Sequence, residues 1–258
     1  MAEKSQEDFK KDFKDYFSND SASYLKYRPN YPIELFNYIS SLTPNHDTAY
    51  DFGCGSGQAT ITLANFFDKV IGIDASSEQI NNAIKLKNTE YKIAKAHESN
   101  LPNQSCDLIT VVNALHWFDI EKFFHEAKRL LKPPGVIAIW CYNLFTVNES
   151  IDKVFAEYFN LLESYWPPER ELVKQKYQTI NFPFKEIQTP EFKICENWTL
   201  DHLFGYLRTW SAYNNYRKEH SQCPLSLIKD RISETWVNES YPVYFNINLR
   251  VGNLIKIC

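Results

Sequence analysis

The sequence predicts an α/β fold with a doubly wound, mostly parallel sheet of seven strands, one antiparallel edge strand and a helical cap from the C-terminal part. Two observations carry this prediction. Residues 48–143 alternate between short apolar runs and stretches with helical spacing, an order that is typical of a parallel sheet. From about residue 150 onward the chain changes to long, aromatic-rich helical stretches, which we expect to cover the sheet.

Seven segments have the character of strands. The first five are apolar runs that predict buried strands, and they read TAYDF, KVIGID, YKIAKA, DLITVVNAL and GVIAIW. A sixth strand is expected over residues 192–199. The residues from 243 to 258 fit either one long strand or two short ones.

Helix boundaries have their own local signals. Ser76 and Gln79 form a capping-box pattern, so a helix is expected to begin there. Asp119 is the expected N-cap of a second helix. This helix is expected to end at the residues Lys132 to Gly135 (KPPG), where the strand GVIAIW begins. Residues 151–166 and 201–216 predict the two main helices of the cap.

The chain of 258 residues is expected to form a single domain. Apolar residues make up 44% and aromatic residues 16% of it, enough for a sizeable core and an apolar pocket. We divide the domain into an N-terminal helical segment (1–45), a ligand-binding core (46–145), a helical cap with one strand (146–240) and a returning strand (241–258).

Composition argues against several partners. With 28 basic and 32 acidic residues the net charge is −4. The sequence has no stripe of basic residues of the kind that binds nucleic acid, so a nucleic-acid partner is not expected. No apolar run approaches the roughly 18 residues that span a membrane, and the charged N-terminus does not resemble a signal peptide, so a cytoplasmic location is expected. The six cysteines are far apart without a C-x-x-C pair, which predicts free thiols and no metal site.

The stretch YDFGCGSGQATITLA contains three of the seven glycines, Gly53, Gly55 and Gly57. It lies between the first predicted strand and a helix that begins near Gln58, so its backbone amides would face a ligand above the strand ends. The dinucleotide motif G-x-G-x-x-G requires glycine or alanine where this chain has Gln58, and the G-K-[ST] of a P-loop is missing. A dinucleotide-dependent dehydrogenase is therefore a weaker alternative.

Two acidic residues complete this pattern. Asp51 opens the glycine loop, and Asp74 ends the next strand, where a carboxylate can accept hydrogen bonds from both hydroxyls of a ribose. A nucleoside without a pyrophosphate fits this arrangement.

Several segments of the chain resemble the motifs of a known family. The segments DFGCGSGQAT, IGIDAS, HESNLP, NALHWFD and AKRLLKPPG resemble class I S-adenosylmethionine-dependent methyltransferases of the small-molecule (methyltransferase type 11) group. The segments KYRPNYP, ALHWFD and FGYLRTWSAYNNYRKEH are similar to its trans-aconitate methyltransferase-like branch. One departure is Pro134-Gly135, where the family has a glycine pair.

The resemblance implies a Rossmann-like fold, with S-adenosylmethionine as cofactor, S-adenosylhomocysteine as product and a small-molecule acceptor. The first expectation for the acceptor is a carboxylate of the trans-aconitate type, and the protein is expected to be a monomer or homodimer. The resemblance assigns these residues to the cofactor: Tyr27, Arg28, Asp51, Gly53, Gly55, Gly57, Asp74, Ala75, Ala96, His97, Glu98 and Asn113. Asp74 would hold the ribose, the loop glycines the methionine portion, and residues 96–98 the adenine.

Methyl transfer mainly requires two reactants held in attack geometry, so no catalytic residue is obligatory. If the acceptor is a carboxylate, arginine would orient it, and Arg28, Arg208 and Arg217 are candidates. If the acceptor is a hydroxyl or amine, His116 is the candidate general base, although it could instead pack beside Trp117.

Aromatic side chains would wall a site for a sulfonium ion. The candidates are Tyr24, Tyr27, Trp117 and Phe118. A further alternative is a catalytically silent protein that keeps the cofactor pocket and regulates a partner.

Overall fold

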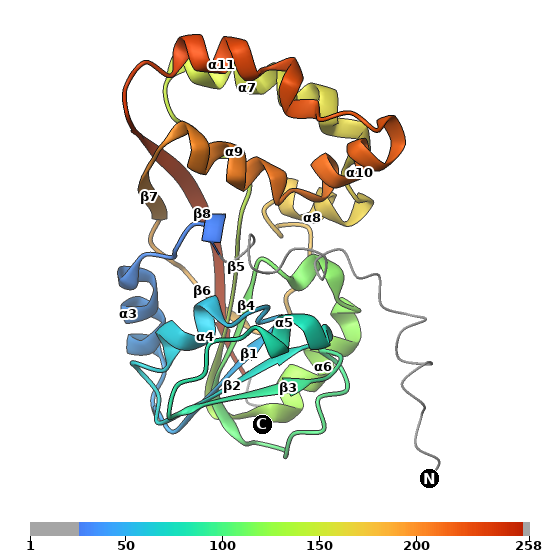
Figure 1. Ribbon diagram of the computed structural model, residues 1–258. Coiled ribbons are helices and arrows are strands. Elements are labelled where there is room, and N and C mark those ends of the chain that lie inside the picture. The colour runs from blue at the N-terminus through green and yellow to red at the C-terminus, as the bar shows by residue number, and fades with distance from the viewer. Residues whose placement is uncertain (1–25, 255–258) are drawn as a thin grey trace.

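The computed structural model describes residues 26–254, which form an eight-stranded sheet, helices on both of its faces and a helical cap above one end (Figure 1). The strand order is β3-β2-β1-β4-β5-β8-β6, and β7 also pairs with β8. The strands are β1 (Thr48–Phe52), β2 (Lys69–Asp74), β3 (Thr89–Ile93), β4 (Cys106–Val112), β5 (Leu131–Tyr142), β6 (Lys185–Ile187), β7 (Phe192–Trp198) and β8 (Tyr241–Asn253).

The five strands from β3 to β5 are parallel, and β8 runs antiparallel to β5, β6 and β7. The predicted doubly wound, mostly parallel fold with a C-terminal cap is confirmed. Two details differ from the prediction. The sheet has an eighth strand, β6, which the sequence does not predict because it has only three residues and no apolar run. This edge of the sheet is formed by β6 and β7, which both pair with β8, and not by β8 itself. The returning strand β8 is a single long strand.

Successive residues of the parallel strands point to opposite faces of the sheet. Leu108 and Val136 belong to the core that α3 (Ile33–Leu42) and α4 (Gln58–Leu63) cover. Their neighbours Ile109 and Ile137 belong to the core on the other face, which α6 (Ile120–Leu130) covers. Both faces are buried, which explains why these strands are continuous apolar runs.

The predicted helix starts are confirmed. The Ser76 hydroxyl accepts a hydrogen bond from the Gln79 amide at the start of α5 (Ser77–Asn81). The Asp119 carboxylate likewise accepts from the Lys122 amide at the start of α6. The end of α6 differs from the prediction, because β5 begins directly at Leu131 and includes the residues KPPG that were expected to lie between helix and strand.

The cap is more divided than the sequence predicts. The stretch 201–216 forms two helices because the backbone of Trp210 is extended (φ −75°, ψ 136°), and residues 146–240 contain two strands where one was expected. The elements of the cap are α7 (Glu149–Leu162), η3 (Glu163–Tyr165), η4 (Pro168–Arg170), α8 (Glu171–Lys174), α9 (Leu200–Arg208), α10 (Ser211–His220), η5 (Pro224–Leu227) and α11 (Lys229–Thr235).

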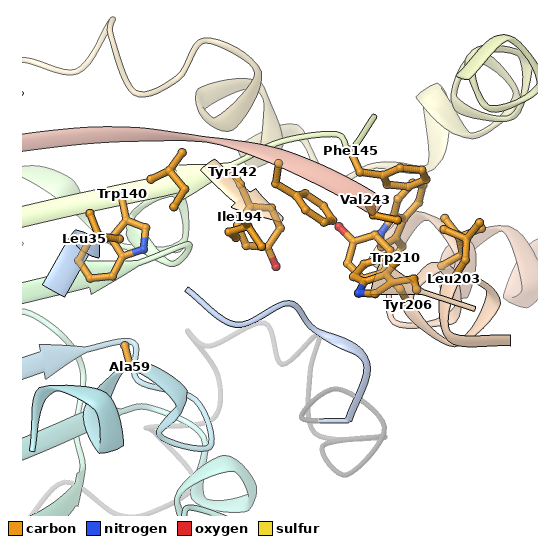
Figure 2. Packing of buried hydrophobic residues seen from close by; sticks show 14 of the residues in the cluster. Leu35, Ala59, Trp140, Tyr142, Phe145, Ile194, Leu203, Tyr206, Trp210 and Val243 are labelled. Carbon is orange, nitrogen blue, oxygen red and sulfur yellow. The ribbon is translucent and has the colours of Figure 1, made fainter. Parts of the chain in front are cut away.

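One hydrophobic cluster joins the sheet to the cap (Figure 2). It runs from Leu35 of α3 past Trp140 and Tyr142 of β5 to Tyr206 and Trp210 in the cap. At the same end of the sheet, η4 packs against the short helix η2 (Leu115–Trp117) that follows β4. The cap therefore lies over the carboxyl end of β4, where ligands of such sheets bind.

Within residues 26–254, no helix has both the length and the apolar character needed to cross a membrane. The same part of the chain has no group of three His, Cys, Asp or Glu side chains that could hold a metal ion. The five cysteines in this range are free thiols, and Cys54, Cys106 and Cys141 are buried.

Candidate active site

A cavity of about 540 Å³ opens at the carboxyl ends of β1 to β4, where the strand order reverses between β1 and β4. Its volume is within the range of small-molecule sites, about 300 to 1,000 Å³. Among the predicted cofactor residues, seven line it: Gly53, Gly55, Asp74, Ala75, Ala96, His97 and Asn113. The predicted aromatic residues Trp117 and Phe118 line it as well, together with Glu169 from the cap.

Asp74 connects the glycine loop to the end of β2. Its carboxylate accepts hydrogen bonds from the amides of Gly55 and Ser76, both at 2.8 Å. The Gly53 amide also donates to the Ile73 carbonyl at 2.8 Å, so the loop is held against β2 by backbone and side chain together. A carboxylate has about four lone-pair sites, so Asp74 can also accept hydrogen bonds from a bound hydroxyl.

Gly53 allows the loop after β1 to come close to the loop after β4. Its φ is +66°, and a Cβ atom at this position would lie 2.4 Å from the Cβ of Ala114. A side chain here would meet both backbone strain and a direct clash. The chain therefore needs glycine at Gly53 to form this wall of the cavity.

Asp51 lies in the core and does not line the cavity. Its carboxylate accepts hydrogen bonds from the hydroxyls of Thr60 in α4, at 2.7 Å, and Thr110 in β4, at 2.8 Å. Burial raises the pKa of this carboxyl group to about 6, and the two hydroxyl donors partly oppose the increase. Asp51 thus joins β1, α4 and β4 beneath the residues that form the site.

The remaining predicted cofactor residues lie elsewhere. Gly57 and the exposed Glu98 do not line the cavity. Tyr27 packs on α9 in the cap, where its ring lies edge-on to His202 with 5.4 Å between ring centroids. Tyr24 falls outside the described residues.

A smaller cavity of about 80 Å³ lies beside the first, and Asn113 and Trp117 line both. Its other lining residues come mainly from β5 and the cap, and they combine aromatic rings with two guanidinium groups. They are Arg28, His116, Tyr142, Asn143, Leu144, Trp166, Pro167, Arg170, Val173, Tyr206, Trp210 and Ser211.

Arg170, from η4, is fixed in this smaller cavity. Its Nη2 donates to Oδ1 of Asn143 at 2.8 Å, and its guanidinium lies 4.0 Å from the centroid of the Trp166 ring. Arg170 forms no ion pair with any residue between 26 and 254. Burial lowers its pKa, but an arginine stays protonated in proteins, so a positive charge faces the cavity.

Arg28 supplies the second guanidinium. Its Nη1 donates to the Tyr142 hydroxyl at 3.3 Å, and its Nη2 donates to the Thr209 carbonyl at 3.4 Å. The guanidinium also lies 5.1 Å from the centroid of the Tyr206 ring. These contacts connect the N-terminal segment with β5 and the cap, and hold Arg28 at the smaller cavity.

His116 lies in η2 and lines the same cavity. Its Nδ1 is 2.8 Å from the hydroxyl of Tyr177, whose pKa burial raises well above its ordinary value. Burial, assisted by the charge of Arg170, lowers the pKa of His116 to about 3. The imidazole is therefore neutral at physiological pH.

The structure does not bring all the predicted arginines to the site. Arg208 and Arg217 are exposed and line neither cavity. Sequence reasoning missed Arg170 and Glu169, which lie in the segment WPPER without any recognisable motif. They reach the cavities only because η4 packs against η2, a contact between distant segments that leaves no local sequence signal.

Comparisons with known proteins agree with this geometry. A family described as "Methyltransferase domain" matches residues 50–139. The chain is 35% identical over 246 residues to a Dictyostelium discoideum protein named as a methyltransferase, covering 90% of this chain and 94% of the other. It is 25% identical over 262 residues to CRG1 of Saccharomyces cerevisiae, named as an S-adenosylmethionine-dependent methyltransferase, covering 85% and 86%.

The fold is also similar to that of a solved structure. A protein from Anaeromyxobacter dehalogenans, described as a type II methyltransferase, matches with a TM-score of 0.82 and 37% identity. The match covers 88% of this chain and 97% of that protein. The similarity therefore extends over both the sheet and the cap.

Proposed function

Because the chain belongs to the S-adenosylmethionine-dependent methyltransferase family, we propose that it transfers the methyl group to a carboxylate of a small molecule, of the trans-aconitate type. The observation that carries the proposal is the pair of guanidinium groups, Arg28 and Arg170, in the cavity beside the larger one. A cytoplasmic location, a monomer or homodimer, and the absence of nucleic-acid or membrane partners belong to the same proposal.

The residues of the larger cavity fit S-adenosylmethionine. Asp74 would accept hydrogen bonds from the ribose hydroxyls, as its place at the end of β2 favours. Ala96 and His97 would lie beside the adenine, and Gly53 and Asn113 beside the methionine portion. When bound, the cofactor supplies a methyl group activated by a positively charged sulfur.

The smaller cavity, of about 80 Å³, would hold the carboxylate of the acceptor, and the rest of the acceptor would extend toward the larger cavity. Asn113 and Trp117 line both cavities, so the boundary between the two is the place where donor and acceptor would meet. Arg28 and Arg170 would orient a carboxylate there, since a guanidinium can hold two carboxylate oxygens at once. A carboxylate needs no proton removed, and holding the reactants in place can contribute about 7 to 11 kcal/mol.

The alternative acceptor, a hydroxyl or amine with His116 as general base, has less support. A group with a pKa of about 3 is a weak base at neutral pH, because efficient bases have pKa values near the working pH. A silent regulator that keeps the cofactor cavity is the remaining alternative. It predicts cofactor binding without turnover.

The proposal is tested by incubating the protein with methyl-labelled S-adenosylmethionine and a panel of small carboxylic acids that includes trans-aconitate. We expect label that becomes volatile after mild base, because methyl esters hydrolyse under those conditions. Label in a base-stable product would instead identify a hydroxyl or amine acceptor and refute the carboxylate assignment. Cofactor binding without transfer to any acceptor would favour the silent regulator.

A further inference from the structure

Two consecutive residues of η4 face different cavities. Glu169 lines the larger cavity and Arg170 the smaller one. Because η4 packs against η2, and Trp117 of η2 lines both cavities, Glu169 lies near the boundary between the two. The cap thus brings a carboxylate to the place where donor and acceptor meet.

The carboxylate of Glu169 has an unusual environment. Its Oε2 atom is buried and receives no hydrogen bond from any residue in the range 26–254. Neighbouring carboxylates are paired: Glu163 and Glu171 both contact Lys174, at 2.6 Å and 3.4 Å. Buried polar atoms usually have partners, so an unpartnered oxygen that lines a cavity indicates a ligand that supplies one.

We propose that Glu169 provides the negative charge that faces the sulfonium of bound S-adenosylmethionine. The transferred methyl group is attached to the sulfur, so the sulfur must lie at the boundary with the acceptor cavity, where Glu169 is. The other carboxylates that line the larger cavity are already engaged. Asp74 holds backbone amides, and Asp119 contacts Lys122 at 2.7 Å.

This assignment makes Glu169 a residue that selects between substrate and product. S-adenosylhomocysteine lacks the positive charge on sulfur, so the carboxylate stabilises the methyl donor and not the product. Because that charge disperses as the methyl leaves, the contact favours binding of the donor and not the chemical step. Glu169 would therefore limit product inhibition.

Calorimetric binding of three ligands to the full chain tests this inference without any acceptor. They are S-adenosylmethionine, S-adenosylhomocysteine and sinefungin, in which a carbon bearing a cationic amine replaces the methylated sulfur. For Glu169→Gln we expect about tenfold weaker binding of S-adenosylmethionine and sinefungin, as for loss of one charged contact. Affinity for S-adenosylhomocysteine should stay within about twofold. The exposed control Glu171→Gln should change none of the three affinities.

Two outcomes of the binding measurement would overturn the inference. An equal loss for all three ligands would assign Glu169 to a group that donor and product share, and no loss for any of them would remove it from the site. Thermal unfolding of the ligand-free protein gives a separate readout. Glu169→Gln should unfold at or above the wild-type temperature, because the substitution removes the negative charge of a carboxylate whose Oε2 atom is buried and has no partner within residues 26–254. A lower unfolding temperature would indicate that Glu169 has a structural partner and would contradict the inference.

Discussion

Replacing Asp51 by asparagine should make the stability of the protein less sensitive to rising pH. Asp51 is buried, and burial raises its pKa from 3.8 to about 6 in the folded state. A raised pKa in the folded state means that the protonated form contributes stability below about pH 4. That contribution is lost as the pH rises through about 6, where the folded protein must hold a buried negative charge.

The size of the effect follows from the pKa difference. One pKa unit corresponds to about 1.36 kcal/mol, so the change from 3.8 to about 6 represents about 3 kcal/mol in total. About 2 kcal/mol of this falls between about pH 4.5 and about pH 7.5. The wild-type protein should therefore lose about 2 kcal/mol of unfolding free energy relative to Asp51→Asn over that range.

Urea unfolding followed by tryptophan fluorescence measures this difference at both pH values. Comparing the two proteins at each pH cancels the contributions of the titrating groups that do not interact with Asp51. Thr110→Val serves as a second arm, because removing a hydroxyl donor at 2.8 Å should raise the pKa of Asp51 further and enlarge the pH effect. A stability difference between wild type and Asp51→Asn that does not change with pH would refute the reasoning.

Three other predictions concern the loop, the cap and the histidine. Asp74→Ala should weaken S-adenosylmethionine binding at least about tenfold by calorimetry, since the carboxylate both anchors Gly55 and lines the cavity; unchanged affinity would refute the ribose assignment. Gly205→Ala should lower the unfolding free energy by about 1 to 3 kcal/mol, against the usual gain in a helix, because its Cβ would lie 2.3 Å from the Tyr27 ring. A stabilised variant would show that the Tyr27 ring moves aside at little cost in free energy. His116→Gln should transfer methyl groups within about threefold of the wild-type rate, and a larger loss near neutral pH would favour the general base.

The features predicted from the sequence are those that local patterns determine. The parallel strands have buried faces on both sides, so they appear as apolar runs, and the N-caps at Ser76 and Asp119 act within one helical turn. The proposed cofactor half of the site follows from the same locality, because Gly53 directly follows β1 and Asp74 is the last residue of the adjacent strand β2.

The features missed depend on contacts between distant segments. Strand β6 has three residues, and it pairs with β8 near the C-terminal end of the described chain. The break at Trp210 separates two stretches that have helical character on their own. The proposed acceptor cavity is lined by both Arg28 and Arg170, which are far apart in the sequence, and neither the spacing nor the neighbours of these residues predict that they line one cavity.

Asp51 illustrates a different limit. The sequence places it at the start of the glycine loop, but residues near the end of a strand can face either a ligand or the core. The carboxylate of Asp51 faces the core because the hydroxyls of Thr60 and Thr110 donate hydrogen bonds to it there. Their partnership with Asp51 depends on the packing of α4 and β4 against β1.

The central claim, that the acceptor is a carboxylate held by the arginines of the smaller cavity, is tested most directly by the kinetics of Arg170→Gln. The measurement is the KM and kcat for the best acid of the panel, compared with the exposed control Arg208→Gln. We predict a KM increase of at least about tenfold for Arg170→Gln and no change for the control, since loss of a charged hydrogen bond costs about 1.5 to 3 kcal/mol. An unchanged KM in Arg170→Gln, or an equal increase in both variants, would contradict the account.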